Sequence, residues 1–169
     1  MNGHPTYRVV FGVDCGLSGA IAVLRDGQFA GVADMPTIGR GKKGRLQVNP
    51  NVLADYFREH VGAAPGAHVF AIIEQTQAMP GQGRSAGHNY GISFGVVIGA
   101  LAALRIPYAI VHPAKWKKQL NLSSNKEDSR RMATERYPEA PLARKRDDGR
   151  AEAILLAHWC NRFEGWIES

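Results

Sequence analysis

Cysteine is scarce in this chain. Its 169 residues include two cysteines, Cys15 and Cys160, which lie far apart and have neither the spacing of a disulfide framework nor that of a metal-ligand cluster. This excludes the small secreted domains held together by disulfides, and a reducing cytosol is the simplest setting for the protein.

Long apolar runs are also missing. The longest one, residues 92–104, is shorter than the roughly 20 residues that a helix needs to cross a bilayer. The first six residues have neither the basic nor the apolar segment of a signal peptide. We therefore expect a soluble, intracellular protein with no membrane partner, and its length suits a single domain over residues 1–169.

Acidic residues are fewer than basic ones. The chain has 15 Asp and Glu and 21 Lys and Arg, which gives a net charge of +6 and an isoelectric point near 9.6. Such an excess favours a polyanionic partner, nucleic acid first and an acidic membrane surface second. Between Lys115 and Arg136 there are seven basic residues and three acidic ones, although such a run can also be a solvated face.

The chain is organised around an apolar run, residues 7–13, that ends in Asp14. The run predicts a central strand buried on both faces. Glycines at 16 and 19 allow a tight turn into a second, antiparallel strand over residues 20–24, and residues 28–36 predict a third. A carboxylate at the end of a buried strand is costly unless a cation binds it, but Asp14 can also simply begin the turn.

The same pattern recurs later in the chain. Residues 68–74 form a second apolar run that ends in a carboxylate, Glu74, and residues 106–111 predict one more strand. Helices are expected over five segments, which begin near residues 50, 89, 114, 126 and 150. The sequence thus predicts an α/β domain with a five-stranded mixed sheet, its first three strands antiparallel, flanked by helices.

Two more carboxylates stand at the start of the last predicted helix. Asp148 and Glu152 are four residues apart and share one face, although acids at a helix start are also favourable through capping and the helix dipole. Converging carboxylates repel one another, so a cluster of Asp14, Glu74, Asp148 and Glu152 would be stable as anions mainly around divalent cations. Two Mg²⁺ ions about 4 Å apart would suit phosphodiester cleavage.

Two glycine-rich segments have open interpretations. The segment 39–45 is basic and predicts a mobile loop, either a solvated linker or an arm that contacts phosphate. In the helix expected over residues 89–104, small residues recur every four positions and form one stripe, which indicates either tight packing within the monomer or a dimer interface. The stripe consists of Gly91, Gly95, Gly99 and Ala103.

Taken in order, these motifs resemble the RuvC-type Holliday junction resolvases of the RNase H-like superfamily, and more closely their small phage-encoded relatives. The resemblance covers nearly the whole chain. It rests on residues 11–16, residues 73–75, the glycine-rich helix up to Leu104, the basic residues Lys117, Lys118 and Lys126, and residues 150–153.

The resemblance implies a crossover junction endodeoxyribonuclease, a homodimer that nicks two strands of a four-way DNA junction in the cytoplasm of a bacterium or of a phage-infected host. It implies Mg²⁺, two ions per active site with Mn²⁺ as a substitute, and no nucleotide cofactor. The implied metal ligands and catalytic acids are Asp14, Glu74, Asp148 and Glu152, with Lys126 as a catalytic basic residue near the scissile phosphate. The expected DNA contacts are Lys115, Lys117, Lys118, Arg130, Arg84, Lys42 and Lys43.

The chain departs from the family pattern at several positions. Cys15 stands where many members have proline, and Glu152 stands where the pattern has Asp. Asp148 lies four residues before Glu152, whereas the bacterial pattern has three, so Asp147 is an alternative fourth ligand. Gln77 stands where bacterial members often have an aromatic that probes the junction, so their sequence preference is not expected here.

Two other functions compete with this interpretation. Actin-like and sugar-kinase-like ATPases share the hairpin with its acid, but they normally need two such domains and a second glycine-rich phosphate loop. A non-catalytic nucleic-acid-binding module of the same fold would keep the basic face, yet it would have no use for four aligned acids.

Overall fold

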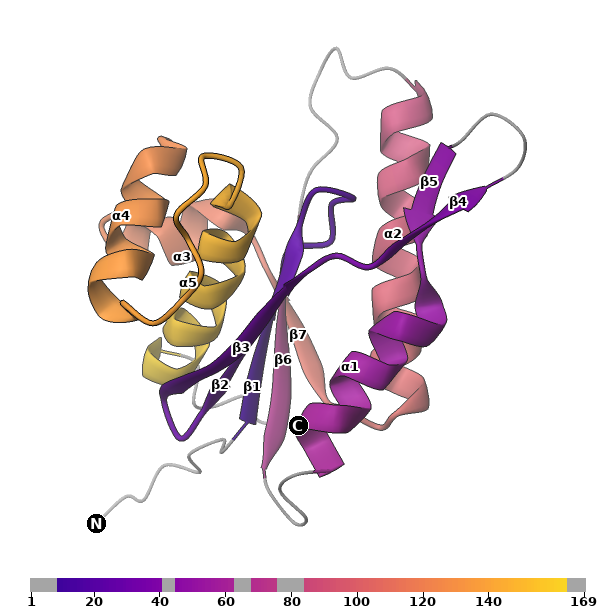
Figure 1. The fold of residues 1–169 in the computed structure, drawn as a ribbon, viewed down its shortest axis with the longest axis horizontal. Helices are drawn as coiled ribbons and strands as arrows, with labels where there is room; N and C mark the ends of the chain where they lie inside the picture. The colour runs from indigo at the N-terminus through magenta and orange to yellow at the C-terminus, as the bar shows by residue number, and fades with distance from the viewer. Residues whose placement is uncertain (1–8, 41–44, 63–67, 76–83, 164–169) are drawn as a thin grey trace.

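The computed structural model describes residues 9–40, 45–62, 68–75 and 84–163, and its centre is a five-stranded mixed sheet (Figure 1). The strand order is β3-β2-β1-β6-β7. This confirms the predicted α/β class, the five strands and the antiparallel arrangement of the first three. The strands are β1 (Val9–Val13), β2 (Ala20–Arg25), β3 (Gln28–Asp34), β6 (Val69–Glu74) and β7 (Tyr108–Val111).

Strand direction brings the two strand-end acids to one edge of the sheet. β1 runs antiparallel to β2 but parallel to β6, and Val13 at the end of β1 lies opposite Ile73 of β6. Since the carboxyl ends of parallel strands meet at the same edge, Asp14 and Glu74 emerge side by side there.

Helices cover both faces of the sheet (Figure 1). α1 and α2 pack on one face, and α3, α4 and α5 lie on the other. A hydrophobic core lies on each face of the sheet, and alternate residues of β1 point into one or the other: Val10 on the α5 side and Phe11 on the α1 side. This explains why the strand is apolar without interruption. The helices are α1 (Pro50–Gly62), α2 (Arg84–Ala103), α3 (Pro113–Gln119), α4 (Lys126–Arg136) and α5 (Asp148–Phe163).

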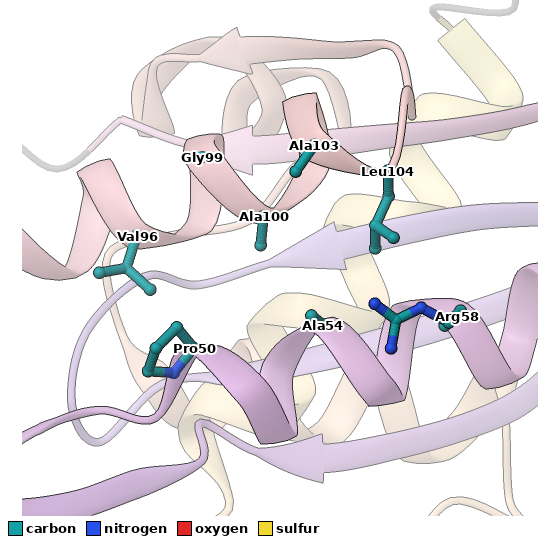
Figure 2. A pocket seen from close by; sticks show the side chains of 8 residues that line it. All are labelled: Pro50, Ala54, Arg58, Val96, Gly99, Ala100, Ala103 and Leu104. Atoms are coloured by element: carbon teal, nitrogen blue, oxygen red, sulfur yellow. The ribbon is translucent and has the colours of Figure 1, made fainter.

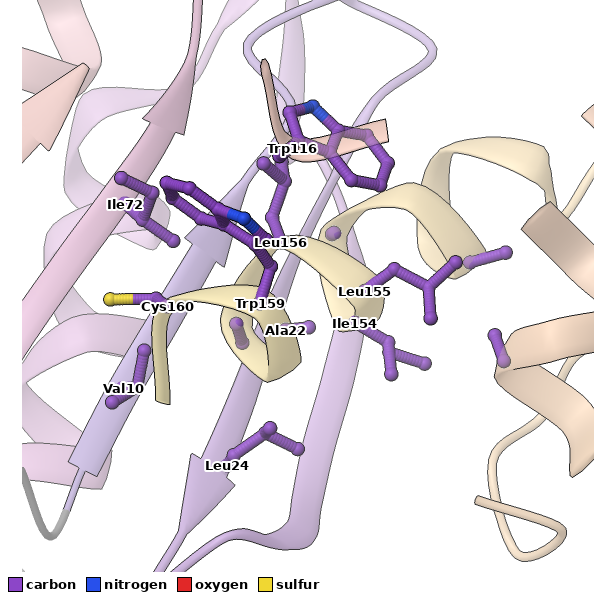
Figure 3. Packing of buried hydrophobic residues seen from close by; sticks show 14 of the residues in the cluster. Val10, Ala22, Leu24, Ile72, Trp116, Ile154, Leu155, Leu156, Trp159 and Cys160 are labelled. Carbon is purple, nitrogen blue, oxygen red and sulfur yellow. The ribbon is translucent and has the colours of Figure 1, made fainter. Parts of the chain in front are cut away.

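α5 lies unusually close to the sheet. A Cβ atom at Gly12 of β1 would stand 2.0 Å from the carbonyl oxygen of Ala153, so only glycine permits this approach. On α5, Ile154, Leu155 and Leu156 are fully buried in the same core (Figure 3). Burial of each contributes about 1.5–3 kcal/mol, which locks the rotation of α5 about its axis.

Several predicted boundaries differ from the structure. α2 begins at Arg84, five residues before the predicted start, because the polar residues after 83 have no helix breaker other than the tolerated Gly87. The predicted loop over residues 39–45 is wrong at both ends, where β4 (Thr37–Arg40) pairs antiparallel with β5 (Arg45–Val48). This hairpin is held by backbone pairing and by Val48, which is buried, whereas Ile38 and Leu46 are exposed.

The small-residue stripe of α2 does not pack inside the described part of the chain. At Gly91, Gly95 and Gly99, an added Cβ atom would meet nothing there within 4 Å, while Ser93, Val97 and Leu101 of α2 are buried. Tight packing of the stripe within the monomer is therefore wrong for the described residues. Two residues of the stripe, Gly99 and Ala103, line an open groove of about 360 Å³ between α1 and α2, together with apolar side chains such as Val96 and Leu104 (Figure 2).

Among the described helices, none combines the length and the apolar character that a membrane span requires.

Candidate active site

Asp14 directly follows β1, at the carboxyl end of this central strand. Its backbone N–H donates to the carbonyl of Ala20, and its Oδ1 accepts a hydrogen bond from the Gly16 amide at 3.2 Å. A Cβ at Gly19 would lie 2.2 Å from the Asp14 carbonyl oxygen, so glycine is required for the chain to return so tightly. Burial raises the pKa of the Asp14 carboxyl; the Gly16 N–H opposes this shift, and the charge of Glu152 adds to it.

Glu74 ends β6 and is 6% exposed. Its Oε1 accepts a hydrogen bond from the indole Nε1 of Trp116 at 3.0 Å. Burial raises the pKa of Glu74 from its ordinary 4.5 to about 7, and the charges of Glu152 and Asp14 add to the shift. Glu74 is therefore a carboxylate that the fold holds in an environment unfavourable to its charge.

Glu152 reaches the same place from the first turns of α5. It is 8% exposed, and its Oε1 lies 2.7 Å from the Nζ of Lys117 on α3. The structure thus brings Asp14, Glu74 and Glu152 together, close enough for the charge of each to act on the others.

Asp148 stands apart from these three acids. It is the first residue of α5, its side chain is about one quarter exposed, and its Oδ1 lies 3.8 Å from the guanidinium of Arg130. Its charge is not among the main causes of the pKa shifts of Asp14 and Glu74. Asp148 therefore borders the group, next to a cation, instead of lying inside it.

Asp147, the alternative fourth ligand, is engaged elsewhere. Its side chain is 2% exposed, and it accepts hydrogen bonds from the backbone N–H of Arg144 at 2.8 Å and from the Arg144 guanidinium. These hydrogen bonds from Arg144 lower the pKa of Asp147. Next to it, Arg150 donates to both carboxylate oxygens of Asp34 at the end of β3. Asp147 thus belongs to an ion-pair network that ties the start of α5 to the sheet.

Two of the predicted lysines lie beside the acids. Lys117 pairs with Glu152, and the charges of Lys126 and Lys117 both lower the pKa of Asp14, against the effect of burial. Lys126 is the first residue of α4, whose helix start is capped by the Asn125 side chain.

The other predicted DNA contacts are more scattered. Lys115 and Lys118 are exposed on α3, and the Nζ of Lys115 lies 5.3 Å from the centroid of the Trp159 ring. Arg130 is paired with Glu127 and borders Asp148. Arg84 begins α2, with a side chain outside the described atoms, and Lys42, Lys43 and Gln77 lie outside the described residues.

The clustered acids offer a suitable donor set for a divalent cation. As the side chains stand, the described residues include no group of three or more His, Cys, Asp or Glu close enough to hold a metal ion. The chemistry of Asp14, Glu74 and Glu152 nevertheless fits Mg²⁺, because all three supply hard oxygen donors and two of them have pKa values raised by burial and mutual repulsion. A cation there would relieve that repulsion, with Glu152 released from Lys117.

The hydrogen bond from Trp116 to Glu74 was not predicted from the sequence. The pattern of residues 114–120 indicates a basic helix that carries one aromatic residue, and nothing in it identifies a buried donor to a carboxylate. The available signal was the type of residue: a buried tryptophan needs a partner for its N–H, and Trp116 lies directly before a lysine expected near the phosphate.

Comparison with known proteins gives matches in structure only. No protein-family model and no curated protein matches the sequence. RuvC from Thermus thermophilus in complex with a Holliday junction substrate superposes with a TM-score of 0.60 at 14% identity, over 89% of this chain and 90% of that chain. A second T. thermophilus RuvC structure gives 0.56 at 16% identity, over 93% and 97%. These likenesses confirm the fold predicted for this chain, which is the RNase H-like fold of RuvC.

Proposed function

We propose that the protein is a Mg²⁺-dependent endonuclease that resolves four-way DNA junctions, and other branched DNA, by paired nicks. One observation carries the proposal: Asp14, Glu74 and Glu152 converge from three separate elements at the carboxyl edge of the sheet, with Lys117 and Lys126 beside them. A fold has no structural need to bury three like charges together, so their convergence favours a site for cations and phosphate. The RuvC structure solved on a Holliday junction substrate has the same fold, which supports branched DNA as the substrate.

The three converging acids would hold Mg²⁺, with Asp148 as the fourth ligand. When bound, two such ions activate a water and stabilise the leaving oxygen of a phosphodiester, and Mn²⁺ would substitute. Asp148 would have to leave Arg130 to join the group. Lys117 would exchange Glu152 for a phosphate oxygen, and Lys126 would hold a second phosphate oxygen in place.

The basic residues of α3 and α4 would bind the DNA backbone next to the acids. Lys115 and Lys118 are exposed on α3, and Arg130 lies beside Asp148 on α4. Three further residues complete the proposed contacts: Lys42, Lys43 and Arg84. Phosphate contacts of this kind position the DNA and carry no sequence information.

Paired nicks require two active sites, and we propose a homodimer for that reason. The exposed stripe of α2, with Gly95 and Gly99, and the apolar groove that Gly99 lines form a face on which a second copy could approach closely.

The test is a nicking assay on a synthetic four-way junction, run beside a linear duplex of the same sequence. We expect Mg²⁺-dependent cleavage of the junction, its loss in Asp14→Asn, and junction binding in Ca²⁺ that is as tight in Asp14→Asn as in the wild type or slightly tighter. Asp55→Asn is the matched control, since Asp55 is an exposed acid of α1 paired with Arg58.

The outcomes separate the competing functions. Binding of the junction without cleavage in any divalent cation would indicate a non-catalytic module of the same fold. ATP hydrolysis without cleavage would indicate the ATPase. Equal loss of binding and cleavage in Asp14→Asn would mean that the acid supports the fold and not the chemistry.

A further inference from the structure

Helix α3 contacts two of the clustered carboxylates through consecutive residues. Trp116 donates its indole N–H to Oε1 of Glu74 at 3.0 Å, and Lys117 places its Nζ 2.7 Å from Oε1 of Glu152. Trp116 is fully buried and Glu74 nearly so, and the two residues are 42 positions apart in the sequence. A hydrogen bond between two buried groups on different elements holds both of them in one orientation.

Trp116 itself has little freedom to move. α3 begins after His112, whose side chain accepts a hydrogen bond from the Ala114 amide, and Pro113 is its first residue. At the other end of α3, the buried Leu120 donates its backbone N–H to the carbonyl oxygen of Trp116 at 3.1 Å. Figure 3 shows Trp116 and Trp159 within the core that packs around α5. The donor is therefore fixed before any ligand arrives.

The contact has a directional consequence for Glu74. Because the indole N–H takes Oε1, the rotation of the carboxylate is restricted and Oε2 is the oxygen that this contact leaves for another partner. A carboxylate oriented in advance loses less conformational freedom when it binds a cation, and hydrogen-bonding partners behind metal ligands commonly tune affinity by about 10- to 100-fold.

We propose that Trp116 is a positioning residue, whose indole N–H holds the carboxylate of Glu74 in the orientation that binds a divalent cation. The inference rests on the proposed role of Glu74 as a metal ligand. Trp116 does not touch the DNA or the cation; it acts through Glu74.

Trp116→Phe tests the inference, and Trp159→Phe is its matched control. Both variants remove a fully buried indole whose N–H is hydrogen-bonded, but the partner of Trp159 is Gln119 and not an acid. Affinity for Mn²⁺ is measured by calorimetry on the full chain without DNA, and the melting temperature of each variant is measured alongside. We expect a similar loss of melting temperature in both, and Mn²⁺ binding about 10- to 100-fold weaker in Trp116→Phe alone.

A second measurement uses the wild-type protein, so that it does not depend on the folding of Trp116→Phe. The chain has three tryptophans, and the indole N–H signal of Trp116 in a ¹⁵N spectrum is assigned by elimination with Trp159→Phe and Trp166→Phe. Mg²⁺ should shift the Trp116 signal and leave that of Trp159 in place. In Glu74→Gln, Mg²⁺ should no longer shift the Trp116 signal.

The failures of the two proposals are distinguishable. If Glu74→Gln abolishes Mn²⁺ binding while Trp116→Phe and Trp159→Phe bind Mn²⁺ equally well, the positioning role is wrong and the metal site stands. The same conclusion follows if Glu74→Gln abolishes Mn²⁺ binding and Mg²⁺ does not shift the Trp116 signal of the wild type. If Glu74→Gln binds Mn²⁺ as tightly as the wild type, Glu74 is not a ligand and the proposed function loses its metal site as well.

Discussion

Replacing Glu74 by glutamine isolates the electrostatic cost of the acid cluster. Glutamine keeps the side-chain shape and an oxygen that can accept the Trp116 N–H, but it carries no charge. The pKa of Glu74 is raised, mainly by burial, from 4.5 to about 7. Between these pH values the folded protein holds a proton that the unfolded chain has lost, so the contribution of Glu74 to stability is present below pH 4.5 and is lost as the pH rises through 7.

The size of the effect follows from the same shift. Each pKa unit is worth about 1.4 kcal/mol, so an ionised Glu74 lowers the free energy of unfolding by roughly 3 kcal/mol at pH 8. We expect Glu74→Gln to be more stable than the wild type by about 2–3 kcal/mol at pH 8, and by little below pH 4.5. Saturating Mg²⁺ at pH 8 should stabilise the wild type and not the variant.

The assay is urea denaturation followed by circular dichroism, in EDTA, at several pH values from 4 to 8. Asp34→Asn is the control with the opposite sign, because the hydrogen bond from Arg150 lowers the pKa of Asp34 and the variant should lose stability at pH 8. An ionised Glu74 does not destabilise the fold if Glu74→Gln is no more stable than the wild type at pH 8, or if the advantage of the variant does not shrink on acidification.

Three further predictions concern activity and assembly. Glu152→Gln should lose nearly all junction cleavage, and Asp148→Asn should lose much of it, with partial recovery in Mn²⁺. Asp147→Asn should lower the melting temperature but keep cleavage at low temperature, because Asp147 binds Arg144. An Asp147→Asn variant that is stable but inactive would make Asp147 the fourth ligand. Lys126→Ala should reduce the slope of log binding constant against log salt by about one, and an unchanged slope in titrations would mean that Lys126 does not contact phosphate. Gly99→Leu should convert a dimer to a monomer in sedimentation, and an intact dimer would place the interface elsewhere.

Local patterns in the chain were enough to predict most of the elements and the position of the strand-end acids. Uninterrupted apolar runs with β-branched residues mark β1 and β6 as strands buried on both faces, and each run ends in a carboxylate, so the pattern alone assigns Asp14 and Glu74 to the edge of a sheet. The fold class followed, because strand periodicity and helix start signals are local properties of the chain. The hairpin of β4 and β5 was not predicted, because its exposed apolar residues and its glycine do not form a clear strand pattern.

Which side chains meet depends on the tertiary packing. Asp147 and Asp148 are neighbours with the same chemistry, yet Asp147 pairs with Arg144 just before it in the chain, whereas the docking of α4 places Arg130 beside Asp148. The hydrogen bond from Trp116 to Glu74 spans 42 positions and depends on how α3 docks against β6. Local patterns report how a segment prefers to fold and not which distant segment it will contact, because such contacts are set by the packing of the whole core.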